Sequence, residues 1–248
     1  MSESYYSRSF VLEDIHLDRF GRLKPSVLLY FVQEISGQHA TQLGAGWQAL
    51  AEKNLFWAII RHRIQITRMP TAGQTIRLET WPMPTTRTAY PRATVAYDEQ
   101  GNELFKTVAL WVLMDSNTRG MVLPGKSGVE VPGILRGNEG DTPGSLPPAA
   151  LANTVNHRVG FSQLDRNGHM NNTRYLDWIS DLMSSSFHAE HIPAQINLCY
   201  LAEALEDQQV CLSWETDSEG TLRVDATHTD ETGKGRKIFS AGVTFSSV

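Results

Sequence analysis

The sequence predicts an α+β protein that consists of two similar units in tandem, and three observations support this fold class. One series of predicted elements, a strand, a polar loop, a long helix and then several strands, occurs twice in the 248 residues. The strand-like runs are separated by turn signals, as is typical of antiparallel sheets. A segment rich in Gly and Pro lies between the two series. Because a helix and a sheet bury their apolar faces against each other, each series predicts a long central helix wrapped by an antiparallel sheet.

The first unit is expected at residues 1–115. It begins with a predicted strand at residues 6–12 and a polar loop at residues 14–21. Pro25 suits the first turn of a helix, where its missing N–H would be unpaired anyway. Four apolar residues then share one helical face: Leu28, Leu29, Val32 and Ile35. A short helical stretch is expected at residues 47–51, followed by strands at residues 55–67, 75–83, 89–97 and 104–115.

The second unit is expected at residues 151–248, after a linker. Residues 116–150 contain 7 of the 19 glycines and 5 of the 11 prolines, so they predict an irregular connection. A strand at residues 154–159 and a polar loop at 165–169 follow. A helix is predicted at residues 172–187, with an apolar face of Tyr175, Leu176, Ile179 and Leu182. The remaining strands are predicted at residues 195–201, 209–216, 222–229 and 237–246.

The two polar loops and the two helices align when the sequence is shifted by 147 residues. At this offset, Asp18-Arg19-Phe20-Gly21-Arg22-Leu23 stands opposite Asp165-Arg166-Asn167-Gly168-His169-Met170, and the apolar faces of the helices coincide. A second offset pairs Glu79-Thr80 with Glu215-Thr216. Few residues are identical, but the element order and the apolar pattern agree, which indicates an internal duplication.

The two copies differ at the positions that could carry chemistry. Asn167 and His169 of the second unit stand opposite Phe20 and Arg22 of the first. An amide and a titratable ring are thus replaced by residues that cannot transfer protons at neutral pH. The sequence therefore predicts a catalytic second unit and a first unit that is free to shape a pocket.

The loop at residues 165–169 places Asp165, Asn167 and His169 directly before a predicted helix. The N-terminus of a helix offers unpaired N–H groups and the positive end of a dipole, which can stabilise a carbonyl oxygen as it becomes an oxyanion. Gly168 would allow a substrate to approach the backbone closely. A structural alternative stays open, in which Asp165 and Asn172 cap the helix and His169 lies on the surface.

Residues 164–175, Leu-Asp-Arg-Asn-Gly-His-Met-Asn-Asn-Thr-Arg-Tyr, resemble the signature of acyl-acyl carrier protein thioesterases from plastids and bacteria. Tyr200-Leu201-Ala202-Glu203-Ala204 is similar to the strand that carries the catalytic Glu of this family. The likeness covers nearly the whole chain and implies the tandem double hot-dog fold. It places four residues in the active site: Asp165, Asn167, His169 and Glu203. Gly168 and Asn172, which lie in the same segment, are expected to contact the substrate.

The resemblance implies that the protein hydrolyses the thioester of fatty acyl-acyl carrier protein and releases free fatty acid. Glu203, assisted by His169, would take a proton from the water that attacks the thioester carbonyl. Some family members carry a Cys directly after this Glu, but here the position is Ala204. A covalent thiol mechanism is therefore not expected. Trp57 and Phe31 are candidates to line the acyl pocket of the first unit, with plain core packing as the alternative.

The expected partner is the acyl carrier protein, and no cofactor or metal ion is expected. Two other functions stay open: an acyl-CoA thioesterase of the same fold, and a non-catalytic protein that binds acyl chains. The basic residues of the first unit fit either a solvated sheet surface or a docking patch for the acidic carrier: Arg61, His62, Arg63, Arg68, Arg77, Arg87 and Arg92.

The composition excludes several classes of protein. A net charge of −5 argues against nucleic acid as the main partner. No apolar run reaches the roughly 20 residues that span a bilayer, so membrane insertion is not expected. The start of the chain lacks the pattern of a signal peptide, and we therefore expect a cytoplasmic protein. The sequence leaves open whether two chains form a homodimer.

Overall fold

A computed structural model describes residues 4–248 of the chain. The chain divides into two compact units, Met1–Pro143 (unit 1) and Gly144–Val248 (unit 2). The boundary lies inside the segment 116–150 that the sequence predicts as a linker. Among the described residues, no helix combines the length and the apolar character that a membrane span requires.

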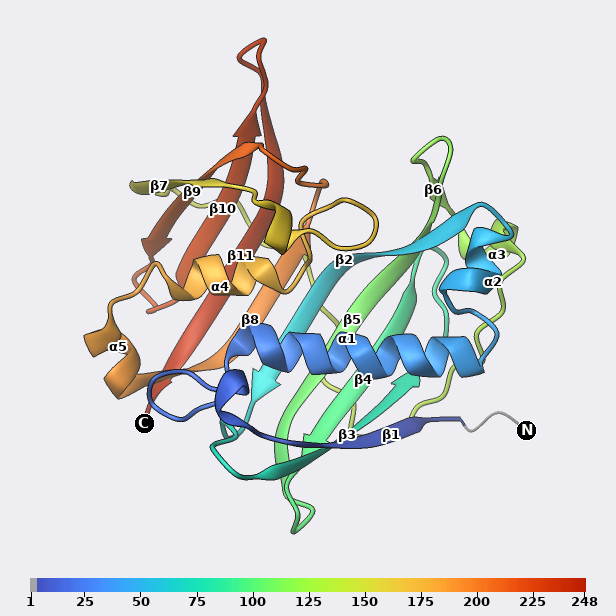
Figure 1. Ribbon diagram of the computed structural model, residues 1–248, viewed down its shortest axis with the longest axis horizontal. Coiled ribbons are helices and arrows are strands. Elements are labelled where there is room, and N and C mark those ends of the chain that lie inside the picture. Colours follow the sequence, from blue (N-terminus) through green and yellow to red (C-terminus); the bar gives the residue numbers. More distant parts are fainter. Residues whose placement is uncertain (1–3) are drawn as a thin grey trace. The chain divides into compact units, whose positions relative to one another are not determined.

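Unit 1 contains an antiparallel sheet with a long helix on one face, which Figure 1 shows. Within this unit the strands follow the order β1-β3-β4-β5-β2, and the short β6 pairs with β5. The elements are β1 (Tyr6–Val11), α1 (Pro25–Gln42), α2 (Trp47–Ala51), β2 (Leu55–Ile66), β3 (Thr75–Pro82), β4 (Tyr90–Tyr97), β5 (Glu103–Asp115), β6 (Met121–Val122) and α3 (Pro124–Ser127).

Helix α1 is the predicted long helix, and it begins at Pro25 as expected. Its apolar face packs against β1 and β3. Burial of each such aliphatic side chain contributes roughly 1.5–3 kcal/mol, so this face anchors the helix to the sheet. The predicted face is confirmed, because all four of its residues are buried: Leu28, Leu29, Val32 and Ile35.

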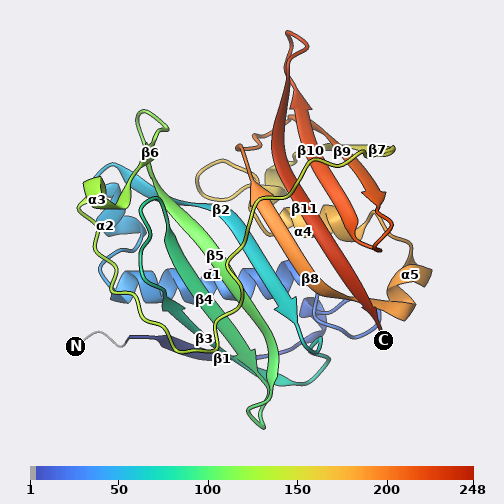
Figure 2. The ribbon, with the colours of Figure 1, turned by 180° about the vertical axis from the view of Figure 1, so that it is seen from behind.

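The opposite face of the unit 1 sheet is covered by the segment that follows α3. Figure 2 shows this segment crossing the strands on the side away from α1. Ile134 packs against the buried cluster of Trp81, Ala93 and Val95, and its backbone N–H donates to the carbonyl of Pro82 at 2.9 Å. The indole Nε1 of Trp81 donates to Glu139 at 3.1 Å. The first part of the predicted linker is therefore an integral layer of unit 1.

Unit 2 has a similar antiparallel sheet, with the strands in the order β8-β11-β10-β9-β7. Helix α4 lies against one face of this sheet (Figure 1). The elements are β7 (Asn153–Arg158), α4 (Arg174–Ser180), α5 (Ser185–Glu190), β8 (His191–Tyr200), β9 (Gln209–Thr216), β10 (Leu222–Thr229) and β11 (Gly235–Ser247).

The prediction of one long helix at residues 172–187 is wrong, because the structure has two short helices there. The hydroxyl of Ser180 donates to the carbonyl of Leu176 at 2.7 Å in the last turn of α4. Ser184 then caps α5, since its side chain accepts from the N–H of Phe187. Serine side chains compete with the helix for backbone groups and favour helix ends, which explains the break.

The polar loop before each first helix has the same backbone geometry in both units. In each loop the Asp accepts from the N–H groups two and four residues later, through Asp18 in unit 1 and Asp165 in unit 2. Gly21 and Gly168 have φ values of +72° and +76°, a left-handed conformation that favours glycine. The structure thus supports the alignment of these loops at an offset of 147 residues.

The sheets of the two units share their irregularities. Ile60 is the extra residue of a β-bulge in β2 against β5, and Ala194 is the extra residue of a bulge in β8 against β11. In a second bulge, Leu104 is the extra residue of β5 against β4, and Ile238 is the extra residue of β11 against β10. Bulges at matching places in both sheets are difficult to explain by chance, so they support a duplication.

The predicted match of Glu79-Thr80 with Glu215-Thr216 is wrong by two residues. Before β3, the N–H of Thr71 donates to the side chain of Gln74 at 2.9 Å, and before β9 Leu205 donates to Gln208 in the same way. These turns align β3 with β9 at an offset of 134, where Glu79 stands opposite Ser213. The short Glu-Thr identity in the sequence was accidental.

Candidate active site

His169 and Glu203 lie next to each other in unit 2. The Nε2 atom of His169 is 3.2 Å from Oε2 of Glu203. The segment after β8 holds them together, because the N–H of Met170 donates to the carbonyl of Ala204 at 2.8 Å and His169 forms an antiparallel bridge with Leu205. The side chain of His169 is 12% exposed and that of Glu203 is 43% exposed. Glu203 can therefore reach water, while the imidazole is mostly enclosed.

Asp165 fixes the backbone of the loop that carries His169. Its Oδ1 atom accepts from the N–H of Asn167 at 2.8 Å and from that of His169 at 3.3 Å. Its own N–H donates to the carbonyl of His169 at 2.7 Å, and the N–H of Gly168 donates back to the carbonyl of Asp165 at 3.0 Å. This closed turn holds His169 in place for its contact with Glu203.

The same bonds use the backbone donors that the sequence suggested for an oxyanion. The N–H groups of residues 167–170 all have acceptors in this loop or in the adjoining segment. Helix α4 begins only at Arg174, and the side chain of Asn171 accepts from the N–H of Thr173 at 3.0 Å. Within residues 4–248 the side-chain amide of Asn167 makes no hydrogen bond, so its N–H groups are available to donate to a bound substrate.

Asn172 connects the loop to the core of unit 2. Its backbone carbonyl accepts from the hydroxyl of Tyr200 at 3.2 Å. Burial raises the pKa of Tyr200 well above its usual value, so this hydroxyl stays protonated and can donate. The backbone of Asn172 thus has a structural role. Asn172 is not the cap of the helix, because the N-cap residue of α4 is Thr173, and its contact with substrate stays a prediction.

Unit 1 keeps the loop but lacks the pair of titratable groups. Arg22 takes the place of His169, and its Nε atom donates to Asp18 at 3.2 Å. Met69, which is buried, takes the place of Glu203 at the offset of 134. Sequence comparison of the two halves identified the first replacement but not the second, because the loop and the strands have different offsets.

Comparison with known proteins identifies the family. The model of the acyl-ACP thioesterase N-terminal domain matches residues 3–123, and that of the acyl-ACP thioesterase C-terminal domain matches residues 149–247. The chain belongs to the acyl-ACP thioesterase family. Its His169–Glu203 pair lies in the part that matches the C-terminal domain of this family.

Curated relatives of this acyl-ACP thioesterase family member include plant proteins. A chloroplastic palmitoyl-acyl carrier protein thioesterase of Gossypium hirsutum is 25% identical over 217 residues, which cover 82% of this chain and 52% of the relative. A chloroplastic oleoyl-acyl carrier protein thioesterase 1 of Arabidopsis thaliana is 22% identical, with 86% and 64% covered. The chain therefore spans about half to two thirds of the length of these relatives.

Solved structures confirm the predicted α+β tandem hot-dog fold. An acyl-ACP thioesterase from Bacteroides thetaiotaomicron superimposes with a TM-score of 0.85 at 24% identity and covers 98% of both chains. The 12:0-ACP thioesterase from Umbellularia californica has a TM-score of 0.83 at 18% identity and covers 100% of this chain and 99% of its own. At these identities the likeness shows the fold alone.

The two aromatic residues predicted for an acyl pocket both lie in unit 1. Phe31 of α1 is buried and stacks on Phe10 of β1, with ring centroids 4.3 Å apart. Trp57 of β2 donates from Nε1 to the carbonyl of Ala45 at 2.8 Å and packs edge to face on Tyr90 at 4.9 Å. Both residues serve as core in this structure, and their part in acyl binding stays a prediction.

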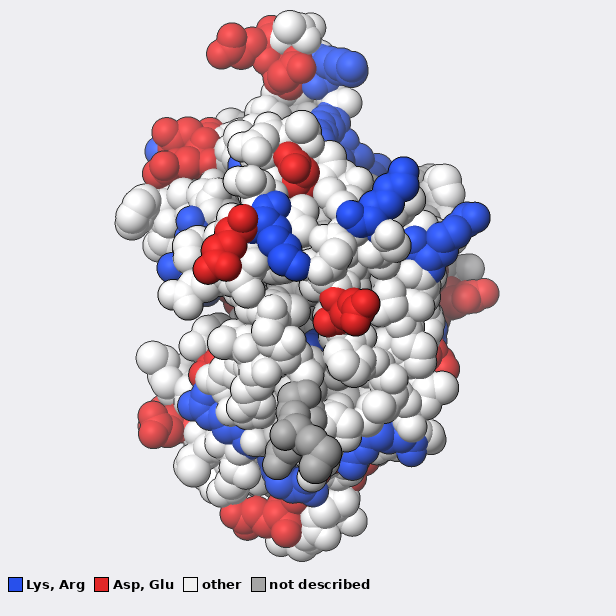
Figure 3. Space-filling model, turned by 90° about the vertical axis from the view of Figure 1, so that its right-hand side faces the viewer, with Lys and Arg blue, Asp and Glu red and all other residues white. Residues whose placement is uncertain are grey.

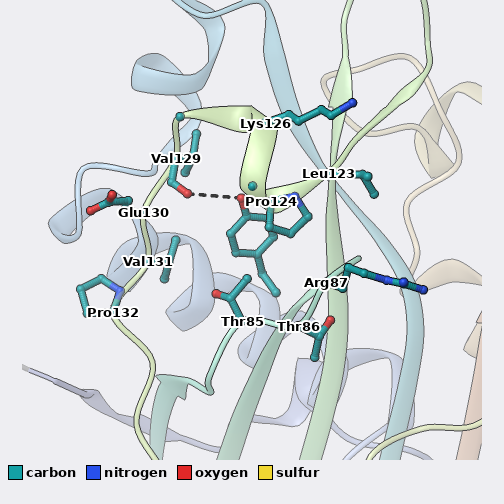
Figure 4. Close-up of a pocket in the computed structure, with 13 residues that line it drawn as sticks. Thr85, Thr86, Arg87, Leu123, Pro124, Lys126, Val129, Glu130, Val131 and Pro132 are labelled. Atoms are coloured by element: carbon teal, nitrogen blue, oxygen red, sulfur yellow. Dashed lines mark hydrogen bonds between the residues drawn. The ribbon is translucent and has the colours of Figure 1, made fainter.

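Unit 1 also has a cavity of about 1060 Å³ beside α3, which Figure 4 shows in close-up. The loop after β3, helix α3 and the segment after it form its walls, with Arg87, Lys126 and Glu130 as charged lining residues. The hydroxyl of Tyr90 donates to the carbonyl of Val129 at 3.3 Å across it. None of the predicted active-site residues lines this cavity.

The predicted basic patch of unit 1 is wrong for two of its members. Arg92 and His62 are buried, so they cannot contribute to a docking surface. Arg68 and Arg77 form ion pairs with Asp98 and Glu79. On the face drawn in Figure 3, acidic and basic side chains are interspersed.

Proposed function

We propose that this protein hydrolyses the thioester of fatty acyl-acyl carrier protein and releases a free fatty acid. The observation that carries the proposal is the contact of His169 with Glu203 at 3.2 Å, on a loop whose backbone Asp165 fixes. The family membership and the names of the relatives support the same substrate class. Acyl-CoA is the alternative substrate.

Glu203 is the general base of this proposal. Its exposed carboxylate takes a proton from a water molecule, and the water oxygen attacks the carbonyl carbon of the thioester. The tetrahedral intermediate then expels the thiolate of the carrier, the C–S bond breaks, and the thiolate takes up the proton. His169 holds the carboxylate in position through its 3.2 Å contact. The products are a fatty acid and the free thiol of the carrier.

Asn167 is the proposed donor to the carbonyl oxygen as negative charge develops there. Its amide makes no hydrogen bond within the described residues, whereas the loop N–H groups are already bonded. A single donor of this kind contributes roughly 10²–10³-fold to turnover. A thiol nucleophile finds no support, because Ala204 follows Glu203 and the thiol of Cys199 donates to the carbonyl of Gly144.

Replacement of the pair tests the proposal. Glu203→Gln and His169→Ala are each expected to lower turnover of acyl-carrier substrates by about 10²–10⁴-fold, the usual contribution of a general base. Release of the carrier thiol measures turnover, and the melting temperature verifies the fold. Glu206→Gln is a matched control, since it removes an exposed carboxylate three residues away. Normal turnover in both Glu203→Gln and His169→Ala would disprove the assignment.

The preference for acyl carrier protein over CoA is a separate part of the proposal. We expect a higher kcat/KM with acyl chains on acyl carrier protein than with the same chains on CoA, and equal values would favour the CoA alternative. In this proposal unit 1 holds the acyl chain and unit 2 carries the chemistry, because Arg22 and Met69 replace the pair in unit 1. The cytoplasmic location stays a prediction from the sequence, which leaves open whether two chains form a homodimer.

A further inference from the structure

A row of polar side chains crosses the helix-facing side of the unit 1 sheet. Thr80 of β3, Thr94 of β4 and Thr107 of β5 stand opposite one another in register, and all three are buried. Arg92 precedes Thr94 by two residues and therefore points to the same side of the sheet. It contacts Nδ1 of His39 in α1 at 3.1 Å, which identifies this side as the one that faces the helix.

Arg92 brings a positive charge into this interior. It is 8% exposed, and its Nη1 atom donates to Nδ1 of His39 at 3.1 Å and to the hydroxyl of Thr80 at 3.3 Å. A guanidinium can only donate, so Nδ1 of His39 accepts and does not neutralise the charge. Burial lowers the pKa of Arg92 to about 10, which leaves it protonated at neutral pH. Among the described residues, no carboxylate pairs with it, and Nε and Nη2 are left without acceptors.

His62 of β2 is a second incompletely bonded group on this side. It is fully buried, and its Nε2 atom lies 2.9 Å from the hydroxyl of Thr107. Its Nδ1 atom has no hydrogen-bond partner in the described part of the chain. Burial lowers the pKa of His62 to about 3, so the ring is neutral. A buried polar atom without a partner costs about 1–3 kcal/mol.

A small side chain lies between these two groups. Ala109 of β5 is the register partner of both Arg92 and His62, one on each neighbouring strand. Trp111, the next residue of β5 on the same side, has an indole Nε1 that is also buried and without a partner in residues 4–248. The polar groups of Arg92, His62 and Trp111 thus lie around the short side chain of Ala109. A plain alkyl chain could form a hydrogen bond with none of them.

We propose that unit 1 accepts a fatty acyl chain that carries a hydroxyl group, and that Arg92 and His62 recognise this hydroxyl. The inference rests on the proposed function, in which unit 1 holds the acyl chain. A hydroxyl can accept from a guanidinium, and it can donate to or accept from a neutral imidazole, whichever tautomer His62 has. It would therefore give a partner to Nδ1 of His62, which a plain chain leaves buried and unpaired, and an acceptor to the guanidinium of Arg92.

Substrate pairs test this inference through hydrolysis. The kcat/KM is measured for carrier-linked acyl chains of equal length, without a hydroxyl and with one at successive positions. At one position we expect a preference of about 10–100-fold for the hydroxylated chain, the effect of a hydrogen bond to a charged group. Arg92→Met should remove the preference, whereas Arg87→Met, which changes an exposed Arg, should keep it. Equal values at every position would overturn the inference, since buried water would then satisfy these groups.

Binding of free fatty acids gives a readout that does not depend on hydrolysis. Calorimetry with plain and hydroxylated fatty acids should show tighter binding of the hydroxylated acid by the unaltered protein, and His62→Phe should reduce the difference. Circular dichroism and melting temperature identify variants that do not fold. Failure to hydrolyse any acyl thioester would disprove the proposed function alone. Equal affinity of the folded, unaltered protein for both acids would disprove the hydroxyl inference.

Discussion

At the scale of single residues, His62 couples the stability of unit 1 to pH. Burial lowers the pKa of this histidine to about 3, from 6.5 in an unfolded chain. Between pH 6.5 and pH 3 the unfolded chain therefore binds a proton that the folded chain excludes. Stability is fully present above pH 6.5 and is lost as the pH falls through this window. At pH 4.5 the loss is about 3 kcal/mol.

His62→Gln should flatten this dependence, because glutamine keeps a hydrogen-bonding group near Thr107 but does not titrate. Thermal unfolding at several values between pH 4.5 and pH 7 measures the effect. We expect the variant to lose less stability across this range than the unaltered protein. An unchanged slope would show that the imidazole is accessible to protons in the folded state.

Asp98 provides a comparison in which stability is also lost as the pH falls, but in a lower pH window. Hydrogen bonds from Asn102 and Arg68 lower the pKa of this carboxyl to about 2, against the desolvation that burial imposes. Its contribution to stability is present above pH 3.8 and is lost as the pH falls toward 2. Asp98→Asn should therefore leave the slope between pH 4.5 and pH 7 unaltered, which separates the two residues.

The candidate site shows which residues can be inferred from sequence. Asp165, Asn167 and His169 stand out because they lie close together in a loop, and resemblance adds Glu203 from 34 residues away. The burial of Arg92 could not be inferred in this way. Its strand has hydrophobic and small residues on both faces, so alternation does not show which side faces the helix.

At the scale of elements, the polar loops of the two units can be compared directly, because they share a conformation but only the second carries His169. Both loops close through an Asp and a glycine of positive φ, Gly21 at +72° and Gly168 at +76°, with no atom near the position of an added Cβ. Replacement of either glycine by alanine therefore introduces backbone strain without a steric clash. The two variants should have similar costs in stability and different effects on chemistry.

Gly168→Ala and Gly21→Ala are each expected to destabilise the fold by about 1 kcal/mol, the cost of a left-handed conformation for an L-residue. Gly168→Ala should also reduce turnover by roughly 10–100-fold, because it displaces His169 from its contact with Glu203. Gly21→Ala should leave turnover close to normal. Melting temperature and release of the carrier thiol measure both effects, and equal losses of turnover would argue against a catalytic role confined to the second loop.

The elements also show where sequence patterns reach their limit. The strands and helix α1 follow from hydrophobic spacing, and Pro25 gives the correct start of this helix. In unit 2 the apolar pattern continues past Ser180, although the helix ends there. Hydrogen bonds from the hydroxyl of Ser180 and to that of Ser184 end one helix and begin the next. Hydrophobic periodicity does not reveal how serine side chains compete for backbone groups.

At the scale of the whole molecule, the segment between the two sheets has two different roles. Up to Pro143 it belongs to unit 1, where Ile134 packs on Trp81 and Arg136 pairs with Glu79 at 2.7 Å. From residue 144 it belongs to unit 2, and residues 147–150 are exposed and have no regular structure. The Gly and Pro content predicted irregular structure throughout, but composition does not reveal which part packs on a sheet.

Insertions at two places distinguish the part of the segment that packs on the sheet of unit 1 from the exposed part at residues 147–150. A flexible Gly-Ser segment of about six residues after Ala150 should lower the melting temperature little, because lengthening an exposed connection costs only about 0.6 kcal/mol per doubling. The same segment after Gly133 should destabilise unit 1 strongly. It separates Ile134 from Pro82 and Trp81, at a place where Gly133 packs so closely on the backbone of Met83 that even a Cβ atom would clash.

Thermal unfolding of both insertion variants measures the difference, and the unaltered protein is the reference. If both insertions were equally harmless, the segment after α3 would be a loose cover and the core of unit 1 would consist of the sheet and α1 alone. We expect the opposite, because the buried side chain of Trp81 has its indole bonded to Glu139 and belongs to an apolar cluster on which Ile134 packs. Removal of this cover would expose a large apolar surface on the outer face of the sheet, at a cost of roughly 25 cal/mol for each Å².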